Sequence, residues 1–528
     1  MEGHGRIVLF PWPLPMTLVL LGLFVIFFLS SIIYNRWFHP LSKYPGPFLW
    51  TVFRWPFAWS LQSGNLVHDT KRFHDRYGKI VRLAPNEVSF IDPQAWSDIY
   101  GHHKKDHKEF IKNPIWAQPA PNGVLSLINA KEKDHPRMRK PFVPAFSVKA
   151  LKDQEHIIQQ YIDLLMKQLT RHANSDLPIV DMKDYYSWTT FDIIGDLGFG
   201  ESFDCLRRET YHDWVSFLFG HLKDGALQAS INFYPWIASI LFALMPKSAY
   251  RAAKAHFELS SQKVRRRMRT ETDRKDILSY VLSLKEEKRL TIPELEATSS
   301  IIILAGSEST STMLTATTNF LLRNPEKLEK LVQEVRSTFH SELQITLAST
   351  DCLEYLRAVF QEVFRLAPPV PTQIPRIVPP EGGSVCGHNL PGNTFVGVPQ
   401  FAAYRYPGHF IFPDRFIPER WLSKESEMFY PSHSDPVFHS ATFQNDCHAV
   451  VQPFSVGPRN CIGVNLAFAE MRLVMARLLY NFDLNIPRKR DAQGNTLVDH
   501  EEYSVFESQK TYALWEREPL RVELSLVQ

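Results

Sequence analysis

The longest uninterrupted apolar stretch of this chain lies near its N-terminus. From Leu14 to Tyr34, about 21 residues, no charged side chain occurs, and about 20 apolar residues suffice to cross a bilayer as a helix. Arg36 and Lys43 follow the stretch, whereas Arg6 is the one Lys or Arg before it. Because basic residues favour the cytosolic side, the pattern predicts a transmembrane anchor with the remainder of the chain in the cytosol.

A cleaved signal peptide is the alternative interpretation, but its apolar core would be shorter and would end in a small-residue cleavage site. We therefore expect a short lumenal N-terminus at 1–13, an anchor at 14–34, a proline-rich hinge at 35–47 and a large body at 48–528. Proline fixes the backbone and breaks helices, so the hinge should be stiff.

In the first part of the body, the sequence pattern predicts a β-hairpin followed by a long helical region. Ile80–Leu83 and Glu87–Ile91 are short runs rich in β-branched and aromatic residues around a Pro-Asn turn. From about 131 to 340 the apolar residues recur mostly at the helical period. Thr291 begins a helix signature with an early proline and Glu294 three residues later. That helix should reach about Leu322, a length on the order of 45 Å.

Later segments of the body predict shorter elements. A second helix should span about 353–366 and stop before Pro368. A third should follow the cysteine at position 461, over about 464–479. Strand-like segments lie near 374–378, 384–386, 394–398 and 511–526. The balance predicts a mainly α fold with small β-sheets.

Charge and cysteine usage exclude some classes of protein. Lys and Arg total 59 against 56 Asp and Glu, a net charge of +3, so no nucleic acid or other polyanionic partner is implied. The five cysteines are scattered and form no CxxC pair, which suits a reducing compartment better than a disulfide scaffold.

The segment 454–463 carries the most specific chemistry of the chain. It places Cys461 in a glycine-punctuated loop directly before a helix-patterned segment. The N–H groups at the start of a helix stabilise a thiolate, and Gly463 lets the backbone approach a flat ligand. Arg459 supplies a cation for an anionic group, and Phe454 supplies an aromatic wall beside the sulfur. These features suit a thiolate ligand of a haem iron; a buried structural cysteine is the alternative.

This loop resembles the haem-binding loop of the cytochrome P-450 family, whose pattern is Phe-x-x-Gly-x-Arg-x-Cys-x-Gly, and every fixed position is present. The resemblance implies the cytochrome P-450 fold, with residues 48–528 as a haem-thiolate catalytic domain behind a single transmembrane helix. It also implies haem b as the cofactor, Cys461 as the axial ligand of its iron, and Phe454 and Arg459 as haem contacts.

Glu362 and Arg365 lie three residues apart on a predicted helix and therefore share a face. Val363 and Leu366 beside them favour burial, whereas a surface ion pair is the alternative. In the family, Glu-x-x-Arg and a later Pro-Glu-Arg element form a buried triad beneath the cysteine loop. The resemblance implies this structural triad for Glu362, Arg365 and Arg420.

The long predicted helix contains the run Ala-Gly-Ser-Glu-Ser-Thr at 305–310. Its glycine, Gly306, costs about 1 kcal/mol relative to alanine in mid-helix, and a ligand against the backbone is one explanation. The run resembles the family pattern Ala/Gly-Gly-x-Asp/Glu-Thr-Thr/Ser, which implies that Glu308, Ser309 and Thr310 are catalytic and deliver protons. Ser309 replaces the usual threonine and lacks the methyl that fixes the rotamer, which predicts looser coupling of oxygen use to product. A polar patch in a buried helix is the alternative.

Three basic residues are candidates for holding the haem propionates. His135 and Arg139 lie four apart on one predicted helical face, and Arg376 lies in a predicted strand. Buried carboxylates need cations or donors, and the resemblance implies that these residues, with Arg459, supply them. His135 stands where tryptophan is common in the family. For each residue, a solvated surface position is the alternative.

The resemblance covers the chain from the anchor to the C-terminus. The sequences of 191–203 and 416–422 are most similar to those of fungal family members that serve secondary metabolism. It implies a monooxygenase at the endoplasmic reticulum membrane that uses O2 and electrons from an NADPH-cytochrome P-450 reductase. NADPH acts through that reductase, and cytochrome b5 is a further candidate partner. The substrate would be a lipophilic small molecule, with a terpenoid or polyketide intermediate as the hypothesis.

Two other functions are compatible with a haem-thiolate chain. An isomerase or dehydratase would rearrange its substrate without a reductase, but would typically lack the acid–alcohol pair. A non-enzymatic haem-binding protein would need no proton relay.

Several further segments have two interpretations each. Arg137, Lys140 and Lys149 form either a basic patch for an acidic redox partner or a solvated helix face. The run 263–269 is a solvated helix end or a lipid contact. The apolar segment 231–245 is core, or the lip of a substrate channel that dips into the bilayer.

Two loop regions complete the prediction. The segment 423–450 is a loop insertion in preference to a metal site formed by His433, His439, Cys447 and His448. The substrate pocket should be apolar and aromatic. We expect it to draw on 110–127, 302–305, 370–372 and 503–506.

Overall fold

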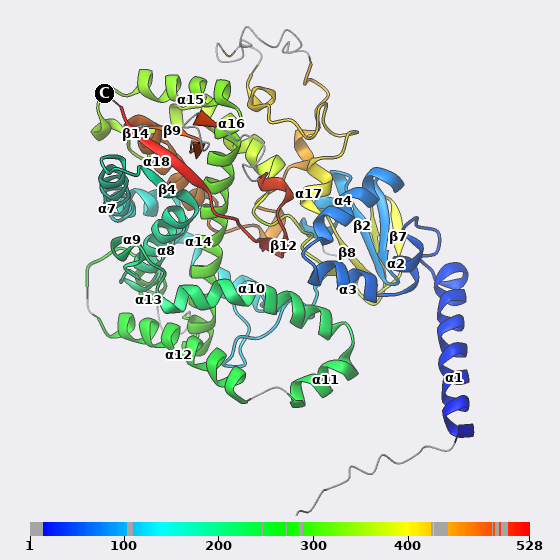
Figure 1. Ribbon diagram of the computed structural model, residues 1–528. Helices are drawn as coiled ribbons and strands as arrows, with labels where there is room; N and C mark the ends of the chain where they lie inside the picture. Colours follow the sequence, from blue (N-terminus) through cyan, green and yellow to red (C-terminus); the bar gives the residue numbers. More distant parts are fainter. Residues whose placement is uncertain are drawn as a thin grey trace, which may run out of the picture.

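The computed structural model describes residues 14–102, 109–244, 247–270, 272–284, 289–423, 426, 442–487, 489–490, 496–497 and 505–527. Over these residues the fold is mainly α with small β-sheets, as the sequence predicts. Figure 1 shows most helices gathered in one half, a sheet with short helices in the other, and the N-terminal helix extending away from the sheet half.

The N-terminal helix is longer than the predicted anchor. α1 (Leu14–Ile33) continues as a π-helical turn, η1 (Tyr34–Phe38), so the helix passes Arg36 before it ends. Among the described residues it is the one helix long and apolar enough to cross a membrane. None of its most apolar window, Leu21–Phe38, is buried.

The hinge that follows is packed against the body. The Arg82 N–H donates to the Pro45 carbonyl at 2.7 Å, and a Cβ at Gly46 would collide with the Arg82 carbonyl. The Asn35 side chain donates to the Val52 carbonyl at 3.0 Å. The proline-rich segment is therefore a fixed part of the fold at its junction with the sheet half.

The sheet half contains a five-stranded sheet in the order β1-β2-β8-β5-β3, antiparallel except for the parallel pair β2 and β8. The predicted hairpin is confirmed as β1 and β2. The strands are β1 (Ile80–Ala84), β2 (Glu87–Phe90), β3 (Ile111–Lys112), β5 (Arg376–Ile377) and β8 (Phe395–Gly397). The helices around them are α2 (Phe48–Val52), α3 (Trp55–Gln62), α4 (Leu66–Tyr77), α5 (Gln94–Tyr100) and α17 (Gln400–Tyr404).

The helical half surrounds α14 (Ile292–Leu322), which runs through its middle in Figure 1. The predicted start of this helix is confirmed as a capping box, because Thr291 Oγ1 accepts from the Glu294 N–H and the Glu294 carboxylate accepts from the Thr291 N–H. The other helices are α6 (His135–Arg139), α7 (Val148–Ala173), α8 (Met182–Phe199), α9 (Cys205–Arg208), α10 (Asp213–Asn232), α11 (Pro235–Leu244), α12 (Lys247–Arg269), α13 (Ile277–Leu282), α15 (Pro325–Thr338), α16 (Glu354–Leu366) and α18 (Val464–Asn481).

Smaller sheets and 3-10 turns connect distant parts of the chain. A three-stranded antiparallel sheet has the order β4 (Ile179–Asp181), β14 (Arg521–Leu526) and β9 (Phe482–Asn485). Two-stranded pairs are β6 (Gly383–Val385) with β7 (His388–Leu390), β10 (Lys489–Arg490) with β11 (Thr496–Leu497), and β12 (Thr511–Tyr512) with β13 (Leu514–Trp515). The 3-10 turns are η2 (Val143–Phe146), η4 (Glu342–Gln344), η5 (Ser349–Cys352), η6 (Pro418–Trp421), η8 (His448–Val450), η9 (Gly457–Arg459) and η10 (Phe506–Ser508).

Helices α8 and α14 approach each other closely at two glycines. A Cβ at Gly306 would lie 3.0 Å from Ile194 Cγ1, and a Cβ at Gly198 would lie 3.0 Å from Ile303 Cδ1. Both distances are shorter than the ~3.5–4.0 Å at which carbon atoms pack best. Helix packing is therefore sufficient to explain the mid-helix glycine of α14.

The apolar segment at α11 does not pack into the core. Trp236, Ile240 and Leu241 are all exposed, so the core interpretation is wrong for these residues, and residues 245–246 lie outside the described part of the chain. By contrast, the basic run at the end of α12 is held by acids from other elements, as in the ion pair of Arg267 with Asp276 at 2.7 Å. Basic side chains at the end of α12 are therefore paired with acids, and Arg267 offers no free charge to a lipid.

Replacing Gly306 with Val should destabilise the protein, because the new side chain would collide with Ile194. Overpacking of this kind costs about 1–3 kcal/mol, and urea unfolding of the detergent-solubilised protein followed by circular dichroism would measure the loss. Gly225 on α10 is the matched control, because a Cβ there meets no atom within 4 Å. Equal unfolding midpoints for the two valine variants would contradict the packing argument.

Candidate functional site

Cys461 lies at the end of a tight loop that leads into α18. Ser455 and Gly457 adopt left-handed conformations, with φ of 60° and 75°, and a Cβ at Gly457 would collide with the Tyr100 carbonyl. The Cys461 N–H donates to the Phe454 carbonyl at 2.9 Å, which closes the loop. The glycine at 457 is therefore required both by its φ and by its close approach to α5.

The Cys461 side chain is reachable by solvent even though protein surrounds it on most sides. These surroundings raise the pKa of the thiol, and the Gly463 N–H and the Arg139 guanidinium oppose that rise. A Cβ at Gly463 would stand 3.9 Å from Cys461 Sγ. Glycine at 463 thus leaves space open directly beside the sulfur.

Phe454 belongs to an aromatic trio next to the loop. Its ring centroid lies 5.2 Å from that of Phe364 on α16 and 5.4 Å from that of Phe468 on α18. These separations are typical of packed aromatic pairs. The predicted aromatic wall beside Cys461 therefore packs against both α16 and α18.

Five basic side chains converge beside the loop, and we call them the cationic cluster: Lys112, His135, Arg139, Arg376 and Arg459. Burial, with a further contribution from the other four members, lowers the pKa of His135 to about 3. Burial, with Arg376 and Arg459, holds the pKa of Lys112 well below its ordinary value. Like charges gathered in a partly buried place indicate a binding site for anionic groups.

Two members of the cluster have side chains that make no hydrogen bond with described residues. The His135 imidazole and the Arg376 guanidinium are only 6% and 4% exposed, and Arg376 packs over the Tyr100 ring at 5.3 Å. Their nitrogen atoms are not among the fully buried polar atoms that lack a partner, so they border accessible space. These two side chains are therefore available to a ligand.

The other predicted members have protein partners. Arg139 donates to the Asn460 carbonyl at 2.7 Å and to its side-chain oxygen at 2.8 Å, so it holds the cysteine loop. Arg459 donates to Glu109 at 2.5 Å and to the Ala130 carbonyl at 2.9 Å. The structure thus brings all four predicted residues together, with Arg459 paired to a carboxylate of the protein.

Lys112 is a member that the sequence analysis missed. It lies in a polar run with other lysines, so its own surroundings gave no signal. The pairing of β3 with β5 sets Lys112 opposite Arg376, and only this pairing brings it into the cluster. The nearby residues 103–108 lie outside the described part of the chain.

Glu362, Arg365 and Arg420 form a fully buried ion-pair network, with 0% exposure for each side chain. Arg365 donates to both oxygens of Glu362, at 2.9 and 2.7 Å, and Arg420 donates to Oε1 at 3.2 Å. The Ile417 N–H and Trp421 Nε1 also donate to this carboxylate, at 2.9 and 2.8 Å. The surface-pair alternative is excluded by this burial.

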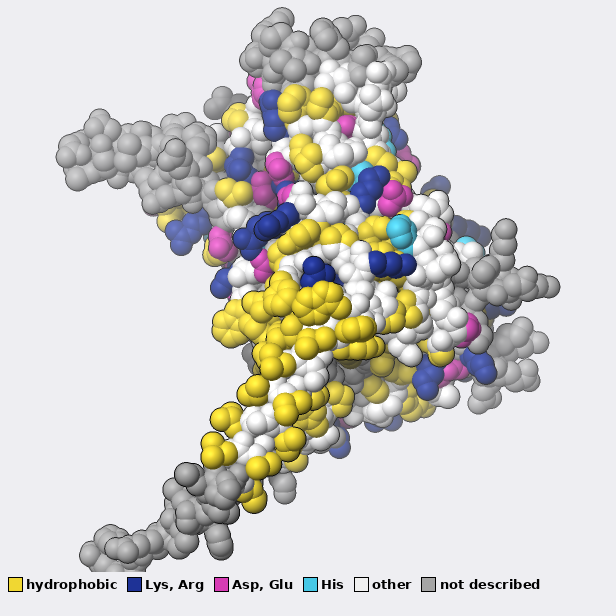
Figure 2. Space-filling view, turned by 90° about the vertical axis from the view of Figure 1, so that its right-hand side faces the viewer, with side chains coloured by type: hydrophobic (Ala, Val, Ile, Leu, Met, Phe, Trp, Pro, Cys, Tyr) yellow, Lys and Arg dark blue, Asp and Glu magenta, His cyan; other side chains and the backbone are white. Residues whose placement is uncertain are grey.

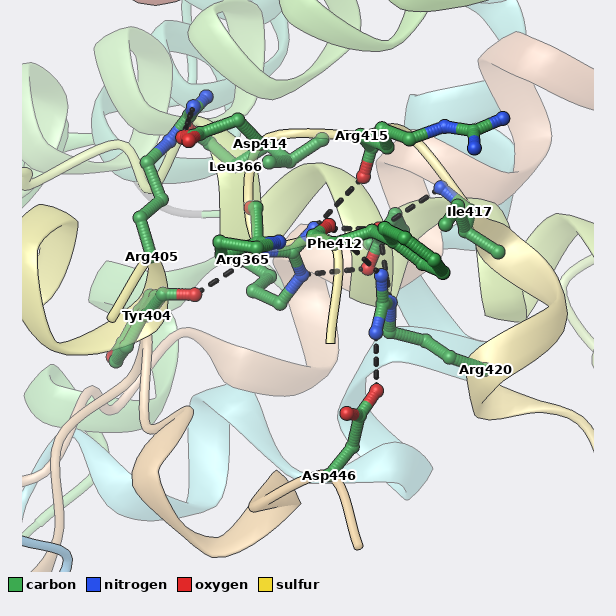
Figure 3. Close-up of polar contacts among 12 residues, drawn as sticks. Arg365, Leu366, Tyr404, Arg405, Phe412, Asp414, Arg415, Ile417, Arg420 and Asp446 are labelled. Carbon is green, nitrogen blue, oxygen red and sulfur yellow. Dashed lines mark hydrogen bonds and ion pairs between the residues drawn. The ribbon is translucent and has the colours of Figure 1, made fainter. Parts of the chain in front are cut away.

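The two arginines bind further groups around the carboxylate. In Figure 3, Arg365 reaches the Tyr404 carbonyl and Arg420 reaches Asp446, which comes from the segment before the cysteine loop. Burial opposes ionisation of Glu362, but Arg365 and Arg420 outweigh it and lower its pKa to about 2. The network therefore connects α16 and η6 with the chain that leads to Cys461.

Residues 442–450 have structural contacts where they are described. The His448 ring stacks on Trp421 at 4.2 Å, and the Cys447 N–H donates to the His409 carbonyl at 2.7 Å. His433 and His439 lie outside the described residues. No group of three or more potential metal ligands occurs among the residues that are described.

The predicted catalytic run does not share one face of α14. Ala305 is exposed although α14 crosses the body. Ser309 lies one turn later, and the Ser309 Oγ donates to the Ala305 carbonyl at 2.7 Å. Glu308 and Thr310 are buried, and Thr310 Oγ1 donates to the Gly306 carbonyl at 3.0 Å. Of the three residues, Ser309 is the one on the open side of the helix.

Glu308 has a partner that the sequence analysis did not find. Arg517, close to the C-terminus, donates to both of its carboxylate oxygens at 2.9 Å and also contacts Ser311. Burial raises the pKa of Glu308, and Arg517 opposes that rise. The two residues are far apart in the sequence, so no local pattern could have shown the pair.

Some of the residues expected in the substrate pocket line one cavity. Val370, Pro371 and Thr372 line an apolar cavity of about 190 Å³ together with Trp116. Phe110 and Phe506 are buried within core clusters instead, and Tyr503 lies outside the described residues.

The residues around Cys461 fit a haem. The thiol is reachable at the start of a helix, Gly463 leaves room beside it, and the cationic cluster offers two unpartnered side chains to a ligand with two carboxylates. A thiolate, neighbouring donors and an aromatic shield are the features by which proteins hold such a group.

Comparison with known sequences agrees with this donor set. The profile of the Cytochrome P450 family matches residues 44–502. The chain is 38% identical over 497 residues to cytochrome P450 monooxygenase astJ of Aspergillus oryzae, covering 94% of each chain. The chain therefore belongs to the cytochrome P450 family and is a cytochrome P450 monooxygenase, a membership that implies a haem-thiolate centre and a reductase partner.

Two other relatives have more specific names. Trichothecene C-4 hydroxylase of Trichoderma arundinaceum is 41% identical over 501 residues, which cover 93% of this chain and 94% of the relative. Averantin hydroxylase of Dothistroma septosporum is 37% identical over 507 residues, which cover 96% of this chain and 90% of the relative.

Glu362 should make the stability of the protein depend on pH at the acid end. Its ordinary pKa of 4.5 falls to about 2 in the fold, so its stabilisation is present above about pH 4.5 and is lost as the pH falls to about 2. The shift corresponds to on the order of 3 kcal/mol. Urea unfolding of the wild type and of Glu362→Gln across this range would measure it. The prediction fails if the free energies of unfolding of the two proteins differ by the same amount at all these pH values.

Proposed function

We propose that this protein is a membrane-anchored monooxygenase that hydroxylates a lipophilic intermediate of fungal secondary metabolism, a terpenoid or a polyketide. The observation that carries the proposal is the reachable thiol of Cys461 beside the cationic cluster, at the start of α18. Two fungal relatives named as hydroxylases support this reaction type. Because their names specify different compounds, neither compound is carried over to this chain.

Haem with a thiolate ligand supplies the oxygen chemistry when it is bound. In our proposal Cys461 Sγ ligates the iron. His135, Arg376 and Lys112 hold the propionates. Arg459 also contacts a propionate, either after its ion pair with Glu109 breaks or while it keeps that ion pair. Arg139 fixes the loop through its two hydrogen bonds to Asn460. These roles divide the basic residues into ligand contacts and loop supports.

Ser309 is the residue that we assign to the last step of proton delivery. Its hydroxyl lies on the open side of α14 and already bonds to the Ala305 carbonyl. Glu308 stands behind it, with both carboxylate oxygens held by Arg517. In this arrangement Glu308 exchanges protons with the open side when the Arg517 ion pair loosens.

A membrane location suits the proposed substrate. α1 is apolar enough to cross a bilayer, and α11 exposes Trp236, Ile240 and Leu241, as expected of a channel lip in contact with lipid. We place the anchor in the endoplasmic reticulum membrane with the body in the cytosol. Lys140 and Lys149 are exposed near the start of α7 and suit an acidic reductase surface, whereas Arg137 is paired with Glu294 at 2.5 Å.

NADPH-driven oxygen uptake with a cytochrome P450 reductase tests the reaction class. We expect uptake to depend on the correct lipophilic substrate, and the product to gain one oxygen atom, as read by mass spectrometry across terpenoid and polyketide candidates. Conversion of a substrate without reductase, oxygen or gain of mass would favour the isomerase instead.

Cys461→Ser should abolish the thiolate-type ferrous–CO spectrum, because serine cannot supply the sulfur ligand. Absorption spectroscopy of the reduced, CO-treated protein would show this. Cys352→Ser is the matched control, since Cys352 is exposed and its thiol donates to the Ser349 carbonyl at 3.0 Å; its spectrum should be unchanged. Retention of the thiolate spectrum in Cys461→Ser would refute the ligand assignment.

Ser309→Ala should leave haem binding intact but uncouple oxygen use from product formation, because it removes the hydroxyl on the open side of α14. General proton transfer of this kind contributes roughly 10²–10⁴-fold, so a large fall in product per NADPH is expected. Thr310→Val is the control, because Thr310 is buried. Unchanged coupling in Ser309→Ala with loss in Thr310→Val would move the relay to Thr310.

A further inference from the structure

A second cavity lies at the junction of the anchor, the hinge and β1, away from the cysteine loop. Its volume is about 340 Å³, within the ~300–1,000 Å³ typical of small-molecule sites. Arg36 from η1, Lys43 and Tyr44 from the hinge, Phe48 from α2 and Arg82 from β1 are among its lining residues. Because the hinge is hydrogen-bonded to β1, the walls of this cavity are held in place by the fold.

The cavity is positively charged. Arg36, Lys43 and Arg82 line it, and no carboxylate of the described residues does. Arg82 is buried, and its guanidinium donates to the Pro85 and Asn35 carbonyls, so these neutral partners leave its charge uncompensated. Burial, with the nearby charge of Arg36, lowers the pKa of Arg82 to about 10, which keeps it protonated at neutral pH. Arg36 and Lys43 are exposed and form no ion pair with described residues.

Tyr44 adds an unused hydrogen-bond donor to these charges. Its side chain is only 6% exposed, and its hydroxyl has no hydrogen-bond partner among the described residues. The Lys43 ammonium lies 5.2 Å from the centre of its ring. Three cations and a free hydroxyl form a donor set that suits the oxygens of a phosphate group.

The surroundings of the cavity are apolar. Figure 2 shows hydrophobic side chains along the N-terminal helix and on the adjoining face of the body. Trp37, Phe38 and Phe48 are exposed there. A ligand in this place would have its anionic group among the cations and an apolar part beside these side chains.

We propose that this cavity binds the phosphate headgroup of an anionic phospholipid of the phosphatidic acid type. Arg36, Lys43 and Arg82 neutralise the phosphate, the Tyr44 hydroxyl donates to it, and the acyl chains leave past Phe48 into the bilayer. The inference rests on the proposed membrane anchoring. A bound lipid would join the hinge to the membrane surface and fix the tilt of the body.

The test uses the full-length protein in a neutral detergent, with calorimetric titration of three probes: short-chain phosphatidic acid, short-chain phosphatidylcholine and inorganic phosphate. We expect saturable binding of the phosphatidic acid at one site, and much weaker binding of the other two. Tyr44→Phe removes one donor without changing charge or shape, and should weaken binding about tenfold. Arg36→Ala with Lys43→Ala should weaken it further.

Arg76→Ala is the matched control, since Arg76 is exposed next to Tyr77 but does not line the cavity. Two results would contradict a specific site: equal affinity of wild type and Tyr44→Phe for phosphatidic acid, or an equal loss of that affinity in Arg76→Ala and Arg36→Ala. Either result would indicate general attraction of the protein to anionic lipids. Inorganic phosphate binding as tightly as the lipid would overturn the lipid assignment. Flotation with phosphatidylcholine vesicles reports anchoring separately, because it depends on α1 and not on Tyr44.

Discussion

The buried carboxylate of Glu362 is the group on which the surroundings of the cysteine loop depend. It accepts hydrogen bonds from Arg365, Arg420, Ile417 and Trp421. A buried charge that loses a partner destabilises a protein far more than a complete network stabilises it. Loss of any one partner is therefore costly, and together the contacts fix α16 against η6. Arg420 extends the network to Asp446, and the Phe364 ring beside Arg365 packs on Phe454, so the loop that presents Cys461 is held from two directions.

The features that could be predicted from the sequence are those whose signal is local. The cap of α14, the β1–β2 hairpin and the Glu362–Arg365 spacing each lie within a few residues, and the cysteine loop adds a strong family resemblance. The features that were missed depend on contacts between distant segments. Lys112 joins the cationic cluster only through the pairing of β3 with β5, and Arg517 reaches Glu308 from near the C-terminus. The strands β3, β4, β7 and β9, of two to four residues, were not predicted, because segments this short show no clear period. The equally short β5, β6 and β8 were predicted only as strand-like segments.

Helix geometry explains why the residues of the predicted catalytic run of α14 lie in different environments. Successive residues point about 100° apart, so Gly306 faces α8, Glu308 and Thr310 face the interior, and Ser309 shares the open side with Ala305. A methyl group at 309 would therefore gain little packing from neighbours, which makes serine tolerable at this position. The same methyl would restrict the hydroxyl rotamer. In the proposed relay, serine in place of threonine would therefore affect proton delivery more than stability.

Arg54 connects α3 and the turn before α11 to the wall of the apolar cavity. The Arg54 guanidinium lies over the rings of Phe57 and Phe233, at 5.1 and 4.6 Å, so it joins α3 to the turn between α10 and α11. It also pairs with the buried Glu87, which accepts a hydrogen bond from Gln373. Glu87 and Gln373 both line the cavity that contains Val370 and Thr372. Arg54 therefore joins α3, the turn before α11 and the wall of that cavity through a largely buried ion pair and cation–ring contacts.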